Sequence, residues 1–318
     1  MVMKNSPLVC AVAGLVVSLG TPLDSSSQTQ RRMRVMASPV SELSGEAIPF
    51  LDSHVHLNDV DVWVDRMDQA EIPRSIVFAG RDVGNEGLLA AARAQPGRLF
   101  PFLSISPEHR EFRGAWEADD PAVVAIADSL LTAGGFFGIG EISVAHFPGT
   151  GFPEADFDPM GRVMRGLMAV AEKHQVPITI HVEVTRLREF EALLEAFPDV
   201  TVIMAHGGYA PLFIARRLLE AHPNLIFELS ARTWIQHPRS PDYTILKDGA
   251  EVWPEWLSLI SELPDRFVVG TDATARSGGS DLGKISSVRN LLSQLDPSVR
   301  DQVARGNMLR LIGVPGPG

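Results

Sequence analysis

The chain has 318 residues, of which 45% are hydrophobic and 21% are charged, an ordinary composition for a globular protein. This length allows one large domain or two ordinary ones. The formal net charge of −11 argues against nucleic acid or an anionic membrane as a partner, because both favour a basic face.

Residues 1–20 have the layout of a secretory signal peptide, in which Lys4 precedes an apolar run over residues 7–20. The run is too short for a comfortable membrane span, so we expect no stable membrane insertion after processing. The protein is then expected to be periplasmic or secreted. If translation starts instead at Met33 or Met36, the protein is expected to be cytoplasmic.

The single cysteine, Cys10, lies inside this predicted leader. A processed chain would therefore have no thiol for a disulfide or a metal site. Any metal would have to be held by His, Asp or Glu side chains.

Residues 21–46 are polar and rich in serine, without hydrophobic periodicity, and we predict a disordered linker there. A single domain is predicted over residues 47–312, followed by a short tail over residues 313–318. In the domain, eight apolar runs are typical of buried parallel strands: 49–52, 75–79, 99–105, 136–142, 178–182, 200–205, 225–229 and 266–270.

Helical patterns fill the gaps between these runs. The clearest covers residues 158–175, where apolar residues recur at i, i+3 and i+4 behind an Asp158 N-cap. The same Asp-Pro start recurs at Asp120 and Asp296, and two more amphipathic segments cover 186–197 and 210–222. Eight strands alternating with helices favour an α/β fold, a (β/α)8 TIM barrel. The alternative is an open doubly wound sheet, but no glycine-rich phosphate loop follows the first strand.

Polar residues with metal-binding side chains stand at the ends of five predicted strands. In the first, "LDSHVHL", Asp52, His54 and His56 share one face because strand side chains alternate with period two. The other four are Glu141, His181, His206 and Asp272. Each alone has an ordinary explanation, such as a buried acid, a core histidine or a helix cap. Together they predict a metal site at the barrel mouth, because strand ends converge there.

The remaining histidines lie in predicted loops or on predicted helices, and we expect them at the surface: His109, His146, His174, His222 and His237. Of these, His146 follows the fourth strand closely enough to reach the mouth.

The segments "DSHVH", "GEI", "IHVE", "MAHGG" and "GTDA" occur in this order on successive strands. This ordered set resembles the amidohydrolase superfamily, and with the closing "GNMLRLIG" it is most similar to the amidohydrolase-related (amidohydrolase 2) branch. The resemblance spans residues 50–312. It implies a metal-dependent enzyme, since that branch includes lactonases, amide or ester hydrolases and nonoxidative decarboxylases.

The resemblance also implies roles for single residues. His54 and His56 would bind one divalent metal together with Asp272, and Glu141 would occupy the carboxylate position of the fourth strand. His181 and His206 would bind a second metal; in members with one metal, His181 joins the first site and His206 polarises the substrate.

One or two ions per chain are expected, with zinc as the expected metal. Zinc lowers the pKa of water from ~15.7 to about 7, so Asp272 could act as the catalytic proton acceptor from the activated water, with His206 assisting. Asp52 would support the histidines or be a structural acid.

Loops after other strands would select the substrate. We expect contributions from Arg81, Glu183, Ser230 and Arg232. Either arginine could bind a carboxylate or phosphate, or instead form a salt bridge on the rim. Trp234 could stack on a ring or cover the core.

The leading hypothesis is hydrolysis of a C–O or C–N bond in a small lactone, ester or amide. The alternative is nonoxidative decarboxylation of an aromatic or unsaturated acid on the same scaffold. A deoxyribonuclease of the TatD type shares "GEI", but the net charge and the "AHGG" and "GTDA" contexts count against it. An inactive binding protein is disfavoured because every expected ligand is present. A small molecule is thus the expected partner, and a homo-oligomer is left open.

Overall fold

Eight parallel strands form the centre of the molecule, as the sequence predicts. The computed structural model describes residues 34–35, 45–148, 154–236, 245–247 and 250–315. The strands are β2 (Leu51–Leu57), β3 (Arg74–Ala79), β4 (Leu99–Pro101), β5 (Ile139–His146), β7 (Ile178–Val182), β8 (Val202–Met204), β9 (Leu225–Glu228) and β13 (Phe267–Val268).

The strands close into a barrel. One sheet has the order β2-β3-β4 and the other the order β13-β9-β8-β7-β5, with parallel pairing throughout. Parallel bridges between Val55 and Ala273 and between Leu103 and Ile139 join the two sheets at both edges. The predicted (β/α)8 barrel is confirmed.

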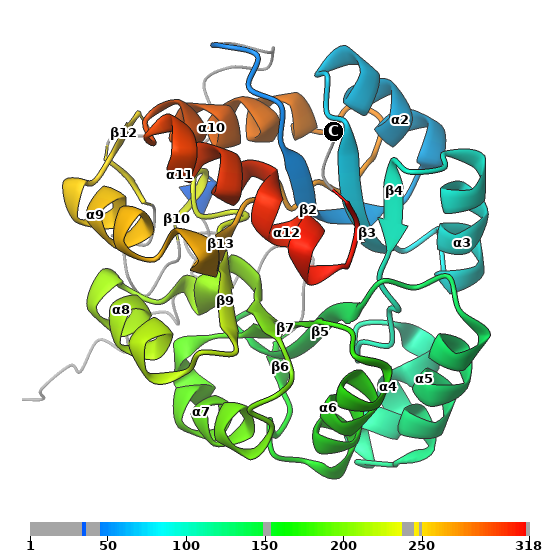
Figure 1. Cartoon of the computed structure of the whole chain (residues 1–318). Helices are drawn as coiled ribbons and strands as arrows, with labels where there is room; N and C mark the ends of the chain where they lie inside the picture. The colour runs from blue at the N-terminus through cyan, green and yellow to red at the C-terminus, as the bar shows by residue number, and fades with distance from the viewer. Residues whose placement is uncertain (1–33, 36–44, 149–153, 237–244, 248–249, 316–318) are drawn as a thin grey trace, which may run out of the picture.

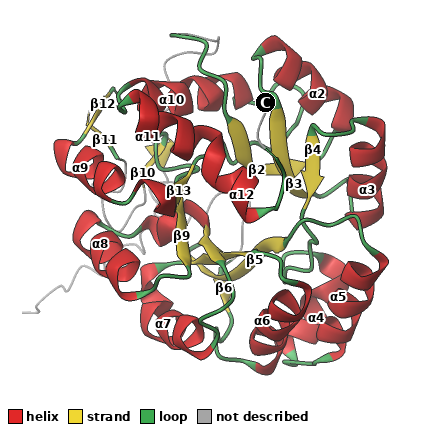
Figure 2. Ribbon diagram, in the orientation of Figure 1, coloured by secondary structure: helices red, strands yellow, loops and turns green. Residues whose placement is uncertain are grey.

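Helices surround the strands (Figure 1, Figure 2). They are α2 (Val60–Gln69), α3 (Asn85–Ala94), α4 (Arg110–Glu117), α5 (Ala122–Ala133), α6 (Arg162–His174), α7 (Leu187–Ala196), α8 (Leu212–Ala221), α9 (Pro254–Glu262), α10 (Asp281–Ser293), α11 (Pro297–Asp301) and α12 (Asn307–Leu311). Their apolar faces pack on the outside of the strands in one large buried cluster.

A second apolar cluster fills the inside of the barrel. Ile76 and Phe78 are two residues apart on β3 and therefore point to the same side. Phe78 meets Phe102, which follows β4, edge to face at 5.6 Å. Met308 and Leu309 of α12 belong to this cluster, and α12 lies across one end of the barrel (Figure 1). That end is closed, so the opposite end is left for a site.

The start of α6 differs from the sequence prediction. Asp158 was the expected N-cap, but its carboxylate accepts from Met160 N and α6 begins only at Arg162. The cap comes from a distant residue, because the Asp119 carboxylate accepts from Arg162 N at 2.9 Å and from Val163 N at 2.8 Å. At the other Asp-Pro starts, α5 begins two residues after the aspartate and α11 one residue after it.

Short strands lie outside the barrel: β1 (Arg34–Val35), β6 (Ala155–Asp156), β10 (Ile235–Gln236), β11 (Leu246–Lys247) and β12 (Glu251–Val252). β1 and β10 form an antiparallel pair, and the two residues of β1 lie within the predicted linker, whose disorder stays a prediction. The predicted signal peptide and most of the predicted linker lie outside the described residues. Within the described residues, no helix has the length and apolar character needed to cross a membrane.

Candidate metal centre

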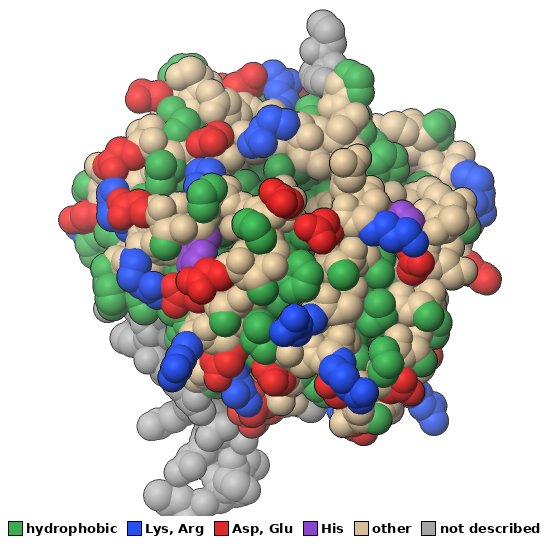
Figure 3. Space-filling model, turned by 60° about the horizontal axis from the view of Figure 1, so that its bottom comes forward, with side chains coloured by type: hydrophobic (Ala, Val, Ile, Leu, Met, Phe, Trp, Pro, Cys, Tyr) green, Lys and Arg blue, Asp and Glu red, His purple; other side chains and the backbone are tan. Residues whose placement is uncertain are grey.

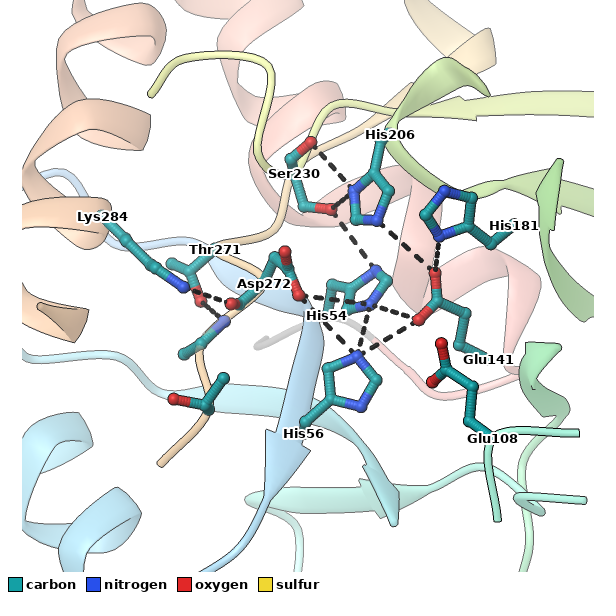
Figure 4. Close-up of polar contacts among 12 residues, drawn as sticks. His54, His56, Glu108, Glu141, His181, His206, Ser230, Thr271, Asp272 and Lys284 are labelled. Carbon is teal, nitrogen blue, oxygen red and sulfur yellow. Dashed lines mark hydrogen bonds and ion pairs between the residues drawn. The ribbon is translucent and has the colours of Figure 1, made fainter. Parts of the chain in front are cut away.

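The six predicted metal-binding side chains come together at the carboxyl ends of the strands (Figure 4). They are His54 and His56 on β2, Glu141 on β5, His181 on β7, His206 after β8 and Asp272 after β13. Parallel strands bring their carboxyl ends to one face of the barrel, which explains how residues more than 200 positions apart can meet.

Glu141 lies between two pairs of histidines. Its Oε2 is 3.4 Å from His54 Nε2 and 3.2 Å from His56 Nε2. Its Oε1 is 3.1 Å from His181 Nδ1 and 3.5 Å from His206 Nε2. One carboxylate thus directs each of its oxygens at a different histidine pair.

Asp272 lies beside the first pair. Its Oδ1 is 3.7 Å from His56 Nε2 and 3.9 Å from His54 Nε2. The residue has a left-handed backbone with φ of 53°, which is uncommon for a non-glycine residue. Lys284 Nζ donates to its carbonyl oxygen at 2.5 Å and lies 4.1 Å from the ring centroid of Trp234. The hydrogen bond from Lys284 therefore stabilises the left-handed backbone of Asp272.

The segment that carries His206 turns sharply after β8. His206, Gly207 and Gly208 all have φ between 51° and 57°. A Cβ on Gly208 would lie 2.1 Å from Met204 Cε and 2.6 Å from Val182 O, so only glycine fits there. The two glycines let the chain reverse and direct the imidazole back over the barrel mouth.

Glu228 is a member of the site that the sequence analysis missed. It lies on β9, is fully buried, and its Oε2 is 3.2 Å from His54 Nδ1. It also accepts hydrogen bonds from the backbone N–H groups of His206 and Ser230. The signal was an acidic residue inside the apolar run "LIFEL", away from the strand end where ligands were sought.

Asp52 acts on the backbone of the site. Its Oδ1 accepts from His54 N at 3.1 Å and Thr271 N at 2.9 Å, and its Oδ2 accepts from Thr271 Oγ1 at 2.6 Å. Burial raises the pKa of Asp52 to about 7, although the hydrogen bonds from Thr271 oppose the shift. Asp52 therefore ties the first barrel strand to the last, in line with a structural acid.

Two residues predicted to bind substrate are fully buried, Ser230 and Arg232. Ser230 Oγ lies 2.8 Å from His206 Nδ1. The Arg232 guanidinium donates to His206 O at 3.3 Å and Ala210 O at 3.0 Å, and it lies 5.0 Å from the ring of Trp256. Both side chains hold the His206 segment in place, and a contact of either with substrate stays a prediction.

The other two predicted substrate contacts differ in exposure. Arg81 is exposed, and its backbone N–H donates to Asn58 Oδ1 at 2.7 Å. Glu183 is buried, with Oε1 3.6 Å from His181 Nε2 and accepting from Phe147 N at 3.1 Å. Glu183 thus lies against His181, and a contact of Arg81 with substrate stays a prediction.

The prediction of a surface position is wrong for two histidines. His146 is buried at the end of β5, with Nε2 3.1 Å from Glu108 Oε1 and its ring 5.3 Å from that of His181. His222 is buried at the end of α8, 3.4 Å from Glu191. Carboxylate partners make both positions tolerable in the interior. His237 lies outside the described residues.

The electrostatics of the centre require positive charge. Burial alone would raise the pKa of Glu141, but the charge on His54 and hydrogen bonds from His181 and His206 hold it well below its usual range. Burial likewise opposes charging of His54, yet the Glu141 carboxylate raises its pKa well above the usual value. A buried carboxylate among imidazoles needs a cation, and a divalent metal supplies one without protonating the histidines.

The donor atoms also fit a metal. Two sets of three residues share Glu141, one with His54 and His56 and the other with His181 and His206. Within each set, the possible ligand atoms lie within 4.8 Å of one another, as they also do in a third set of His54, His206 and Glu228. Imidazole nitrogen and carboxylate oxygen are the usual protein ligands of zinc and of other first-row divalent metals. The residues present therefore fit the metal that the resemblance implies.

Comparison with known proteins agrees with this geometry. The amidohydrolase family model matches residues 52–314. None of the curated proteins matches the chain.

Several solved structures have a similar fold. An uncharacterized TIM-barrel protein from Bordetella bronchiseptica is 16% identical, with 84% of this chain and 99% of that chain covered and a TM-score of 0.60. A probable 2-pyrone-4,6-dicarboxylic acid hydrolase from Acinetobacter baumannii is 12% identical, with coverages of 84% and 100% and a TM-score of 0.51. A dihydroxybenzoic acid decarboxylase from a Polaromonas species, with bound manganese, is 13% identical, with coverages of 83% and 96% and a TM-score of 0.52.

The family model spans most of the chain, and the described residues place a metal-type cluster where this barrel has its active site. The chain therefore belongs to the amidohydrolase family and is an enzyme that depends on a divalent metal.

Proposed function

We propose that this enzyme hydrolyses a C–O or C–N bond of a small lactone, ester or amide. The observation that carries the proposal is the position of Glu141, whose two oxygens face two different histidine pairs. Such a carboxylate can be shared by two cations, and paired metals are typical of hydrolytic sites.

A cation pair held there would supply a Lewis acid for the scissile carbonyl and make water a nucleophile near neutral pH. Zinc is the ion we propose, because four imidazoles surround Glu141. In this arrangement His206 provides a donor nitrogen, and the general base must be another group.

Asp272 is the proposed general base. It lies beside His54 and His56, and its side chain is 22% exposed, so it borders the space open to a substrate. The carboxylate takes one proton as water attacks the carbonyl carbon, and it returns that proton to the leaving oxygen or nitrogen as the C–O or C–N bond breaks.

Nonoxidative decarboxylation remains the second candidate. The observation that favours it is the fold likeness to dihydroxybenzoate decarboxylases, which is as close as the likeness to the hydrolase. In that reaction the substrate's own carboxylate leaves as carbon dioxide. Asp272 would then donate a proton to the ring carbon that carried the carboxylate.

A substrate panel separates the two reactions. Purified chain, depleted of metal and reloaded with zinc or manganese, is tested on lactones, esters, amides and aromatic acids. Release of acid from lactones, esters or amides by the reloaded protein, and not by the metal-depleted protein, supports hydrolysis. Carbon dioxide release from the aromatic acids with no hydrolysis overturns it in favour of decarboxylation.

We also propose a small-molecule substrate and no nucleic-acid partner. The face drawn in Figure 3 supports this, because basic and acidic side chains are interspersed on it rather than gathered into a basic area. Export through the predicted signal peptide and a homo-oligomeric state stay predictions. N-terminal sequencing of the mature protein and its mass in solution test them.

A further inference from the structure

Glu228 has no part in the proposed reaction, yet it is fully buried within reach of the centre. Backbone N–H groups of Ser230 and His206 donate to it at 2.6 Å and 3.2 Å. A backbone N–H cannot reverse its role, so both carboxylate oxygens of Glu228 must accept. Glu228 is thus held as an acceptor on both of its oxygens.

This fixes the proton on His54. Its Nδ1 lies 3.2 Å from Glu228 Oε2 and can bond to an acceptor only if it carries hydrogen. In the neutral imidazole the lone pair is then on Nε2, which faces Glu141 in the centre at 3.4 Å. His54 is therefore set to present Nε2 to a cation.

Ser230 extends the same logic to a second histidine. Its Oγ lies 2.5 Å from Glu228 Oε2, and its one hydroxyl hydrogen must go to that carboxylate. The oxygen is then an acceptor for His206 Nδ1, 2.8 Å away, and the carbonyl of Ser230 accepts from the same nitrogen at 3.2 Å. His206 also carries its proton on Nδ1 and presents Nε2 to the centre.

We propose that the Glu228–Ser230 pair is a positioning unit that sets the Nδ1–H tautomer of both histidines it contacts. The inference rests on the proposed metal centre. In this arrangement the Glu228 carboxylate orients one histidine of each pair around Glu141, His54 directly and His206 through Ser230. Carboxylates behind metal-binding histidines fix ring orientation and raise the basicity of the ligand nitrogen.

The chain offers a matched control. Glu191 also faces a buried histidine, with Oε1 3.4 Å from His222 Nε2, but on the outer helices α7 and α8. Removing its charge should affect stability without affecting a metal at the barrel mouth.

The experiment measures zinc affinity and histidine tautomers in the full chain. Competition with a chelating dye should give a zinc affinity about 10–100-fold lower for Glu228→Gln than for wild type, with Glu191→Gln unchanged. Long-range proton–nitrogen correlation on ¹⁵N-histidine-labelled, zinc-loaded wild type should show hydrogen on Nδ1 of His54 and His206. Ser230→Ala should shift the His206 signals more than those of His54, because His54 Nδ1 keeps the Glu228 carboxylate as its acceptor.

The outcomes separate this inference from the proposed function. Wild type that binds no metal overturns both. Wild type that binds zinc, with hydrogen on Nε2 of either histidine or with equal affinity in Glu228→Gln, overturns the inference alone. If Glu228→Gln does not fold, the wild-type tautomers and the Ser230→Ala shifts decide the question.

Discussion

The two ends of the barrel both contain buried or half-buried polar side chains, but the partners of these side chains differ. At the amino end, Arg266 donates to the carbonyl oxygens of Leu219, His222 and Leu225. Asn307 donates there to Pro264 O and Phe267 O. These groups satisfy backbone acceptors that helices and strands leave open.

At the carboxyl end, polar side chains contact other titratable side chains. Glu141 faces four imidazoles, and Glu228 faces His54. Left-handed, non-glycine backbone also occurs there, at His206 and Asp272. The comparison shows that burial of a polar group does not identify function, whereas several imidazoles gathered around one carboxylate do. Changes at the carboxyl end should then affect chemistry, and changes at the amino end stability.

The largest effect is expected for Asp272→Asn at the carboxyl end. The amide keeps the size of the side chain but cannot accept the proton, so kcat of the zinc-loaded protein should fall roughly 10²-fold or more, with Tm near wild type. Steady-state kinetics on the substrate found in the panel measure this. Asp301→Asn, which changes an exposed carboxylate of α11 that pairs with Arg305, is the control. Near wild-type kcat in metal-loaded Asp272→Asn would make Asp272 structural.

A smaller effect on a different property is expected for Arg289→Met at the amino end. Arg289 of α10 is buried and donates to Ile48 O at 3.1 Å and also to Ala70 O. Its removal should lower the free energy of unfolding by about 1–3 kcal/mol, because both carbonyls lose a charged donor. Urea unfolding measures this, with Arg305→Met, at a half-buried arginine that pairs with Asp301, as a control near zero. Loss of metal in folded Arg289→Met would contradict the division between the ends.

The smallest effect is expected for Asp119→Ala, which removes the cap of α6. Loss of a cap should cost about 1 kcal/mol, measured by urea unfolding near pH 7. Partial burial opposes ionisation, but hydrogen bonds from Val163 and Arg162 lower the pKa of Asp119 below its ordinary 3.8. The stabilisation is thus present above pH 3.8 and lost as the pH falls through the lower folded-state pKa. If the free energies of unfolding of Asp119→Ala and wild type differ by the same amount at pH 7 and well below that pKa, this pH dependence is refuted.

Much of the barrel could be predicted because its strands are buried on both faces. Runs such as 200–205 are almost wholly apolar, so the polar residue that follows, His206, stands out. The gathering of His54, Glu141 and Asp272 follows from topology alone, since parallel strand ends share one face.

Other features depend on contacts that no local pattern records. Glu228 was missed because its partner, His54, lies 174 positions away. Arg232 resembled a rim arginine in sequence, but it turns inward to the carbonyls of the His206 segment. Asp119 caps a helix more than 40 positions later. In each case a tertiary contact determines the role.

The number of metal ions per chain, with and without the Glu141 carboxylate, tests the central claim most directly. Elemental analysis of protein purified without chelator and reloaded with zinc should give about two equivalents for wild type and about one for Glu141→Gln. Glu108→Gln, which changes a carboxylate near the centre that pairs with His146, should keep about two. A wild type with one equivalent, or a Glu141→Gln variant that keeps all its metal, would contradict the proposed two-cation hydrolase.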